Sequence, residues 1–98
     1  MNPATIYHRP LSEFAFATDG THYVFRLRTG KGEARSCRFF YADRAAMSPE
    51  LDFACLPMKK IREDRYFDWY EVRLETKLER IAYYFELSDG AETLCYKK

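Results

Sequence analysis

The chain has 98 residues, of which 47% are hydrophobic and 32% are charged, so it is one globular domain rather than a disordered segment. The formal net charge of +1 gives no basic excess, which argues against a dedicated nucleic-acid binder and against attraction to an anionic membrane. No run of about 18 apolar residues and no apolar leader region is present, which indicates an intracellular, cytoplasmic protein with no membrane partner.

Apolar and polar residues alternate along most of the chain, and short turn motifs interrupt the alternation. In the segment 22–29, Tyr23, Phe25 and Leu27 share one face while arginines occupy the other. We expect about seven strands, within residues 13–18, 22–29, 36–42, 51–58, 65–75, 80–90 and 92–96. The motifs DGT (19–21), GKGE (30–33) and SDG (88–90) are predicted turns, the first because Asp-Gly readily takes a positive φ.

Two further signals refine this pattern. Ser48 and Pro49 are typical of a helix start, so residues 43–51 predict a helix of about one turn. Pro57 cannot donate a backbone hydrogen bond, which places the strand 51–58 at a sheet edge. No predicted helix is long enough for a parallel crossover. The fold class is therefore all-β, an immunoglobulin-like antiparallel β-sandwich formed by residues 1–98 as a single domain.

The three cysteines, Cys37, Cys55 and Cys95, are odd in number and show no CxxC spacing. We expect three reduced and mostly buried thiols. Trp69 follows both Cys37 and Cys55, an order that does not suit a true antibody-type domain. Metal-binding spacings and phosphate-binding glycine loops are also missing from the sequence, so we expect neither a metal nor a cofactor.

A catalytic site is difficult to assemble from these residues. His8 and His22 are isolated in the sequence. Asp68 and Glu71, in the motif FDWYEV (67–72), are three residues apart and would face opposite sides of a strand. The alternation around them suggests a β-bulge near Asp68. We therefore expect no catalytic residue and interpret Asp68 as a solvated carboxylate on a bulged strand.

A basic surface is a second functional hypothesis. Arg26, Arg28, Arg35 and Arg38 could form a stripe across two neighbouring strands, with Phe40 beside it. Single-stranded nucleic acids bind stacking surfaces in basic grooves. Because acidic residues nearly cancel the charge and no RNP-type motif is present, a solvated sandwich face is the simpler interpretation. A free-standing sandwich that binds protein or single-stranded nucleic acid is the alternative function.

Aromatic residues are abundant, with eight Phe, eight Tyr and one Trp. An aromatic ring on a β-surface can stack against the apolar face of a sugar, and the candidates are Trp69, Tyr66, Tyr70 and Tyr84. Core packing or a protein interface is the alternative role for each ring. A sandwich this small does not easily bury so many rings, so we expect some of them to form an exposed interface.

Five motifs carry a resemblance when taken in order: ATIYHRP (4–10), VFRLRTGKGE (24–33), FFYADR (39–44), DRYFDWYEVRLE (64–75) and RIAYYFEL (80–87). Together they are similar to the N-terminal domain of the cyclomaltodextrinases, neopullulanases and maltogenic amylases, members of the α-amylase family of glycoside hydrolases. The resemblance implies a β-sandwich of the carbohydrate-binding module family thirty-four type. Such a domain precedes a catalytic (β/α) barrel, which would lie outside this chain, and the chain would be a fragment of that longer enzyme.

The resemblance also implies a role. The domain would pack against a catalytic barrel in a homodimer, narrow the active-site cleft, favour small substrates such as cyclodextrins, and bind α-glucan weakly. The partner-facing loop would be Asp43, Arg44, Ala45, Ala46 and Met47. Several relatives carry an aromatic residue where Ala45 stands, which predicts weaker substrate shaping by this loop. The motif FDWYEV is then a strand whose rings serve the core and an interface.

Overall fold

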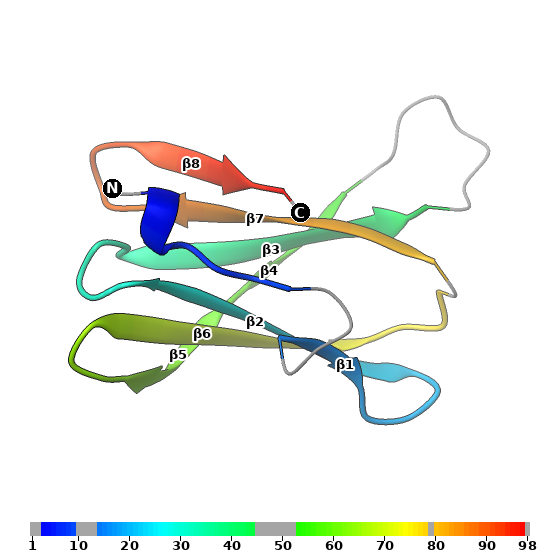
Figure 1. Cartoon of the computed structure of the whole chain (residues 1–98). Helices are drawn as coiled ribbons and strands as arrows, with labels where there is room; N and C mark the ends of the chain where they lie inside the picture. Colours follow the sequence, from blue (N-terminus) through cyan, green and yellow to red (C-terminus); the bar gives the residue numbers. More distant parts are fainter. Residues whose placement is uncertain (1–2, 10–13, 45–52, 79, 98) are drawn as a thin grey trace.

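The computed structural model describes residues 3–9, 14–44, 53–78 and 80–97, which form two antiparallel four-stranded sheets (Figure 1). The elements are η1 (Pro3–Thr5), β1 (Ala15–Ala17), β2 (His22–Gly30), β3 (Ser36–Asp43), β4 (Ala54–Pro57), β5 (Lys59–Glu63), β6 (Phe67–Glu75), β7 (Ile81–Ser88) and β8 (Thr93–Tyr96). The β2/β6 sheet has the order β1-β2-β6-β5, and the β3/β7 sheet has the order β4-β3-β7-β8. The predicted all-β sandwich is confirmed, with one more strand than expected.

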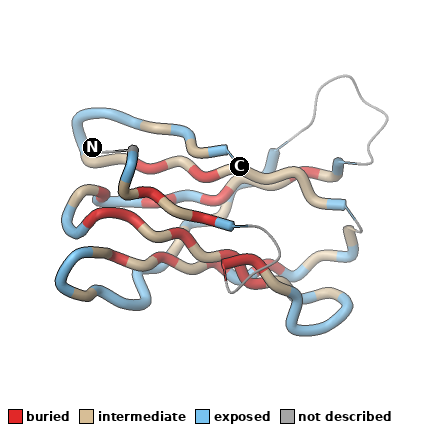
Figure 2. The backbone as a smooth tube through the Cα atoms, in the orientation of Figure 1, coloured by how far each residue is buried: buried red, intermediate tan, exposed pale blue. Residues whose placement is uncertain are grey.

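The core lies between the two sheets and is built by alternation. Phe25 of β2 stacks on Phe39 of β3 with ring centroids 4.5 Å apart, and Phe39 contacts Phe85 of β7 at 5.7 Å. Leu27 and Leu87 are fully buried beside them. Figure 2 shows the buried positions along the central strands and the exposed ones at the hairpins. Burying one such side chain contributes about 1.5–3 kcal/mol, so this layer holds the sheets together.

Strand β6 corrects our interpretation of FDWYEV. It pairs with β2 without interruption from His22↔Glu75 to Gly30↔Phe67, so no bulge lies at Asp68. The register shift is instead on the neighbouring strand β5, between Lys60 and Arg62. Asp68 shares the buried inner face with Tyr70, Val72 and Leu74. The interpretation of Asp68 as a solvated carboxylate is therefore wrong.

One side of the sandwich is closed by a segment that changes sheets. Only Met58 separates β4 from β5, yet β4 pairs with β3 and β5 pairs with β6. The Met58 amide donates to the carbonyl of Cys37 at 2.9 Å, which fixes the crossing point. The predicted edge position of Pro57 is confirmed. Strand β5 was not expected, because its five residues are all exposed and give no alternating pattern.

The other side is closed by the N-terminal segment. The Tyr7 and Arg28 backbones exchange two hydrogen bonds, of 2.8 and 3.0 Å, beside the part of β2 that β1 does not reach. His8 is fully buried, with Nδ1 2.7 Å from the carbonyl oxygen of Arg26 and Nε2 2.9 Å from the hydroxyl of Tyr83. Because a carbonyl oxygen only accepts, Nδ1 donates, and in the neutral imidazole Nε2 accepts from Tyr83. His8 thus joins β2 to β7.

The turns agree with the predicted positions, but one has a different cause. Gly32 and Gly90 have φ values of 71° and 95°, as tight turns require. Gly20 does not, so the expectation that Asp-Gly supplies a positive φ is wrong here. The Asp19 carboxylate accepts from the amides of Thr21 and His22 at 2.8 and 2.9 Å instead. Of the predicted helix 43–51, the structure describes only Asp43, which ends β3, and Arg44. The rest of that segment lies outside the described residues.

The cysteines are free thiols, but their burial differs from our expectation. Cys37 is buried, whereas Cys55 on β4 and Cys95 on β8 are exposed. The expectation of mostly buried thiols is therefore wrong for two of the three. Burial, together with the nearby charge of Asp68, raises the pKa of Cys37 to about 12. This thiol stays protonated and unreactive in the folded domain.

Candidate functional site

The structure separates the four aromatic candidates for sugar contact. Trp69 lies on the outer face of the β2/β6 sheet, and Tyr84 lies on the outer face of the β3/β7 sheet. Tyr66 is 66% exposed in the turn between β5 and β6. Tyr70 is buried, and its hydroxyl donates to the carbonyl of Ala34 at 3.2 Å. These rings do not form one platform, and Tyr70 does not reach any surface.

Trp69 lies at a shallow hollow of about 210 Å³, lined by Phe14, Arg26, Ile61, Arg62 and Trp69. The Phe14 ring stacks against the indole at 5.6 Å with an interplanar angle of 28°. The Arg62 guanidinium lies over the indole at 5.3 Å from its centroid. Drug-sized ligands occupy pockets of about 300–1,000 Å³, so this smaller hollow suits roughly one ring.

The bulge in β5 explains why Arg62 reaches this ring. Before the bulge, Lys60 pairs with Tyr70, and after it Arg62 pairs with Trp69. The one-residue shift brings Ile61 and Arg62 to the same hollow although they are consecutive. Phe14 lies just before β1, and its carbonyl oxygen accepts a hydrogen bond from the Arg26 amide of β2 at 2.7 Å.

Asp64 contacts two of the side chains that line the hollow, Trp69 and Arg62. Its Oδ1 accepts from the amides of Tyr66 and Phe67 at 2.9 and 2.8 Å. Its Oδ2 lies 3.4 Å from Nε1 of Trp69 and 3.8 Å from the guanidinium of Arg62. These amide hydrogen bonds lower the pKa of Asp64, so the carboxylate is ionised at neutral pH.

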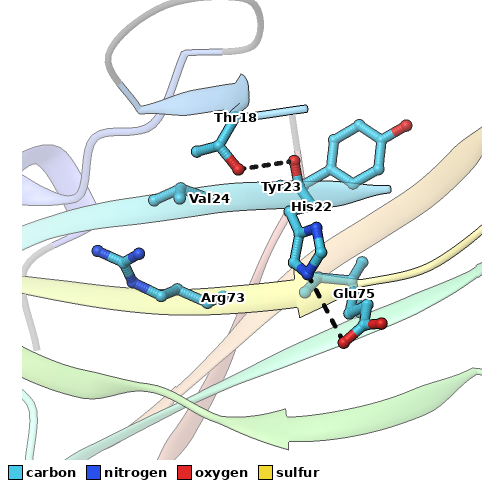
Figure 3. Close-up of a pocket in the computed structure, with 7 residues that line it drawn as sticks. Thr18, His22, Tyr23, Val24, Arg73 and Glu75 are labelled. Carbon is cyan, nitrogen blue, oxygen red and sulfur yellow. Dashed lines mark hydrogen bonds and ion pairs between the residues drawn. The ribbon is translucent and has the colours of Figure 1, made fainter. Parts of the chain in front are cut away.

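A second hollow, of about 250 Å³, lies near the β1–β2 hairpin and holds His22 (Figure 3). His22 has Nδ1 2.9 Å from Asp19 and Nε2 3.6 Å from Glu75. The hydrogen bond to Asp19 raises the pKa of His22. The pKa of Asp19 is lowered to about 2, first by the hydrogen bond from the Thr21 amide and second by that from His22. His22, which is isolated in the sequence, is thus a hydrogen-bond partner of Asp19, as the three-residue spacing between them could have suggested.

The outer face of the β3/β7 sheet carries a second aromatic group, which we call the aromatic face: Phe40, Phe53 and Tyr84. Phe40 and Tyr84 stack in parallel, with centroids 4.7 Å apart and an interplanar angle of 1°. Phe53, 40% exposed, meets Tyr84 edge-on at 5.1 Å. An ion pair between Arg38 and Glu86 borders these rings. The aromatic face thus has an apolar centre and a charged rim.

Two other predicted features have different outcomes. Arg26 and Arg28 lie on β2, and Arg38 lies on β3, which belongs to the other sheet. Arg26 and Arg28 therefore lie on one outer side of the sandwich and Arg38 lies on the opposite side, so the predicted stripe is wrong. Of the loop Asp43–Met47, Asp43 is half-buried and Arg44 is exposed, its amide donating to the carbonyl of Arg80 at 3.0 Å. Ala45, Ala46 and Met47 lie outside the described residues.

Within residues 3–9, 14–44, 53–78 and 80–97, no group of three or more His, Cys, Asp or Glu side chains is placed to hold a metal ion. No helix in those ranges is long and apolar enough to cross a bilayer.

Comparisons with known proteins agree with this architecture. The family described as "Alpha amylase, N-terminal ig-like domain" matches residues 1–98. A solved structure of a cyclomaltodextrinase superimposes with a TM-score of 0.84 at 28% identity, over 98% of this chain and 16% of that one.

Similar sequences carry related names. Neopullulanase 2 of Thermoactinomyces vulgaris is 36% identical over 83 residues, which are 85% of this chain and 14% of that protein. The intracellular maltogenic amylase of Bacillus subtilis (strain 168) is 29% identical over 97 residues, 98% of this chain and 16% of that protein. The chain therefore spans only about one-seventh of the length of such relatives.

Proposed function

The chain belongs to the family of α-amylase N-terminal immunoglobulin-like domains, and on this basis we propose that it is the non-catalytic N-terminal domain of an enzyme that hydrolyses α-glucans. The observation that carries the proposal is a family match over residues 1–98, together with sequence matches over 85% and 98% of this chain that cover only 14% and 16% of the relatives. Catalysis then belongs to a barrel in the remainder of the longer protein. The name of the Bacillus subtilis relative supports a cytoplasmic location.

The first role of the domain is assembly. The aromatic face supports this role because Phe40, Phe53 and Tyr84 expose rings beside one another, and aromatic residues are enriched at protein interfaces. Arg44 follows β3, the strand that carries Phe40, so the loop Asp43–Met47 begins from the same sheet. The domain would pack through this region against the catalytic barrel of its own or a partner subunit, form a homodimer and narrow the cleft for cyclodextrins.

The second role is weak glucan binding at Trp69. The hollow offers an indole ring for a pyranose and the charged group of Arg26 for its hydroxyls. Its small size limits contact to about one sugar ring, and a millimolar site corresponds to only about −4 kcal/mol. Tyr66, exposed nearby in the β5–β6 turn, is the second ring that an oligosaccharide could reach.

The assembly role is tested in the full-length enzyme. Phe40→Glu combined with Tyr84→Glu places two charges on the aromatic face, and we expect loss of the dimer by sedimentation and a lower cyclodextrin-to-starch rate ratio. Ala17→Glu is the control, because it places a charge at an exposed position of β1 in the other sheet, away from both proposed surfaces. An unchanged mass and rate ratio in the double variant would place the interface elsewhere. The isolated chain should release no reducing sugar from starch, pullulan or cyclodextrin.

A further inference from the structure

The indole ring of Trp69 is less accessible than its position on an outer sheet face suggests. Phe14 stacks against it, and the Arg62 guanidinium lies over it. A sugar ring that stacks on the indole needs the surface that Arg62 covers, because Phe14 is buried and held in the fold. The position of Arg62 therefore decides whether this surface is available.

Arg62 is held loosely enough to move. Its side chain is 66% exposed, and its ion pair with Asp64 is long, at 3.8 Å. Exposed cation–π contacts are weak, so leaving the ring costs little. Asp64 does not move with it, because two backbone amides bind its Oδ1. The guanidinium can therefore leave the indole and stay paired with this fixed carboxylate.

We infer that Arg62 guards the indole surface of Trp69, and that a glucan ring stacks there only after the guanidinium moves off the indole while it stays paired with Asp64. Arg62 is then a residue that sets affinity by competing with the ligand, and Asp64 is the positioning residue that holds Arg62 beside the ring. This inference rests on the proposed glucan-binding role for its ligand, but the guarding of the ring does not depend on any ligand.

The test uses Trp69 as its own reporter, because it is the one tryptophan of the chain. Arg62→Ala removes the guard. Arg65→Ala is the matched control. Arg65 is three residues after Arg62, carries the same charge, and lies over the Tyr66 ring at 5.7 Å from its centroid instead of over the indole. We expect acrylamide to quench the indole fluorescence more strongly in Arg62→Ala and equally in Arg65→Ala and the unchanged chain. Far-ultraviolet circular dichroism verifies that each variant is folded.

Titration with maltotriose and β-cyclodextrin adds the second measurement. We expect Arg62→Ala to bind about two- to five-fold more tightly, the range that follows from losing an exposed cation–π competitor. Weaker binding would make Arg62 a ligand for the sugar and overturn its role as a guard. Unchanged acrylamide quenching would overturn the guard directly. Greater quenching without glucan binding by any of the three proteins would support the guard and overturn the proposed glucan role.

Discussion

At the scale of single residues, the carboxylate of Asp68 joins three parts of the fold. Its Oδ2 accepts from the Gly32 amide at 2.8 Å and lies 3.6 Å from the ammonium of Lys60 on β5. Its Oδ1 is buried and has no hydrogen-bond partner. A buried carboxylate is costly unless it is paired, so the amide and Lys60 are what make its position tenable. The polar residue inside FDWYEV is thus an anchor for the turn after β2.

The three cysteines differ in burial and should therefore differ in reactivity. We expect Cys55 and Cys95 to react with a disulfide reagent in the folded domain, because both are exposed. Cys37, buried and with its pKa raised to about 12, should react only after unfolding. Thiol titration should therefore find two groups under native conditions and three in denaturant. Three equally fast thiols in the native domain would mean that the inner face is open to solvent at Cys37.

At the scale of elements, alternation decided what the sequence could predict. Strands β2, β3 and β6 were predicted because one face of each is buried. Strand β5 was missed because all residues of Lys59–Glu63 are exposed, so the segment shows no alternation of apolar and polar residues. The hollow could not be assembled beforehand, since Phe14 and Arg62 meet Trp69 only through strand pairing and the bulge.

The two turns after β1 and β2 offer a matched test of backbone conformation. Gly32 has φ 71°, whereas Gly20 lies outside the left-handed region, and a Cβ at either position would meet nothing within 4 Å. We expect Gly32→Ala to destabilise the domain by about 1 kcal/mol, because an L side chain is strained there. Gly20→Ala should change the free energy of unfolding by less than about half of that. Urea denaturation measures both, and equal effects would contradict the assignment of the strained turn.

At the scale of the whole molecule, the sandwich is closed along both sides. The β4–β5 segment crosses between sheets on one side, and His8 connects β2 with β7 on the other. The sheets are therefore linked through the backbone and a buried side chain as well as through the aromatic core. Such a domain suits a role in which it presents two outer faces in a fixed relation.

The His8 connection predicts a specific loss of stability. Tyr83→Phe removes the hydroxyl that lies 2.9 Å from Nε2 of His8 and leaves the ring contacts in place. We expect it to lower the free energy of unfolding by about 1–3 kcal/mol, the cost of removing one partner of a buried hydrogen bond. His8→Ala should cost more, because it also removes ring contacts with Phe85. Thermal and urea unfolding would contradict this if Tyr83→Phe matched the unchanged chain.

The segment from β4 to β5 has one more consequence, which concerns aggregation. It supplies an edge strand to each sheet, and an edge strand with free backbone groups can recruit a strand from another molecule. Pro57 removes a backbone donor from the first edge, while Lys59, Lys60, Arg62 and Glu63 surround the second with charge. Intermolecular strand addition is thereby discouraged at these two edges by one short stretch of chain, so this side of the sandwich is a poor template for a continuous intermolecular sheet.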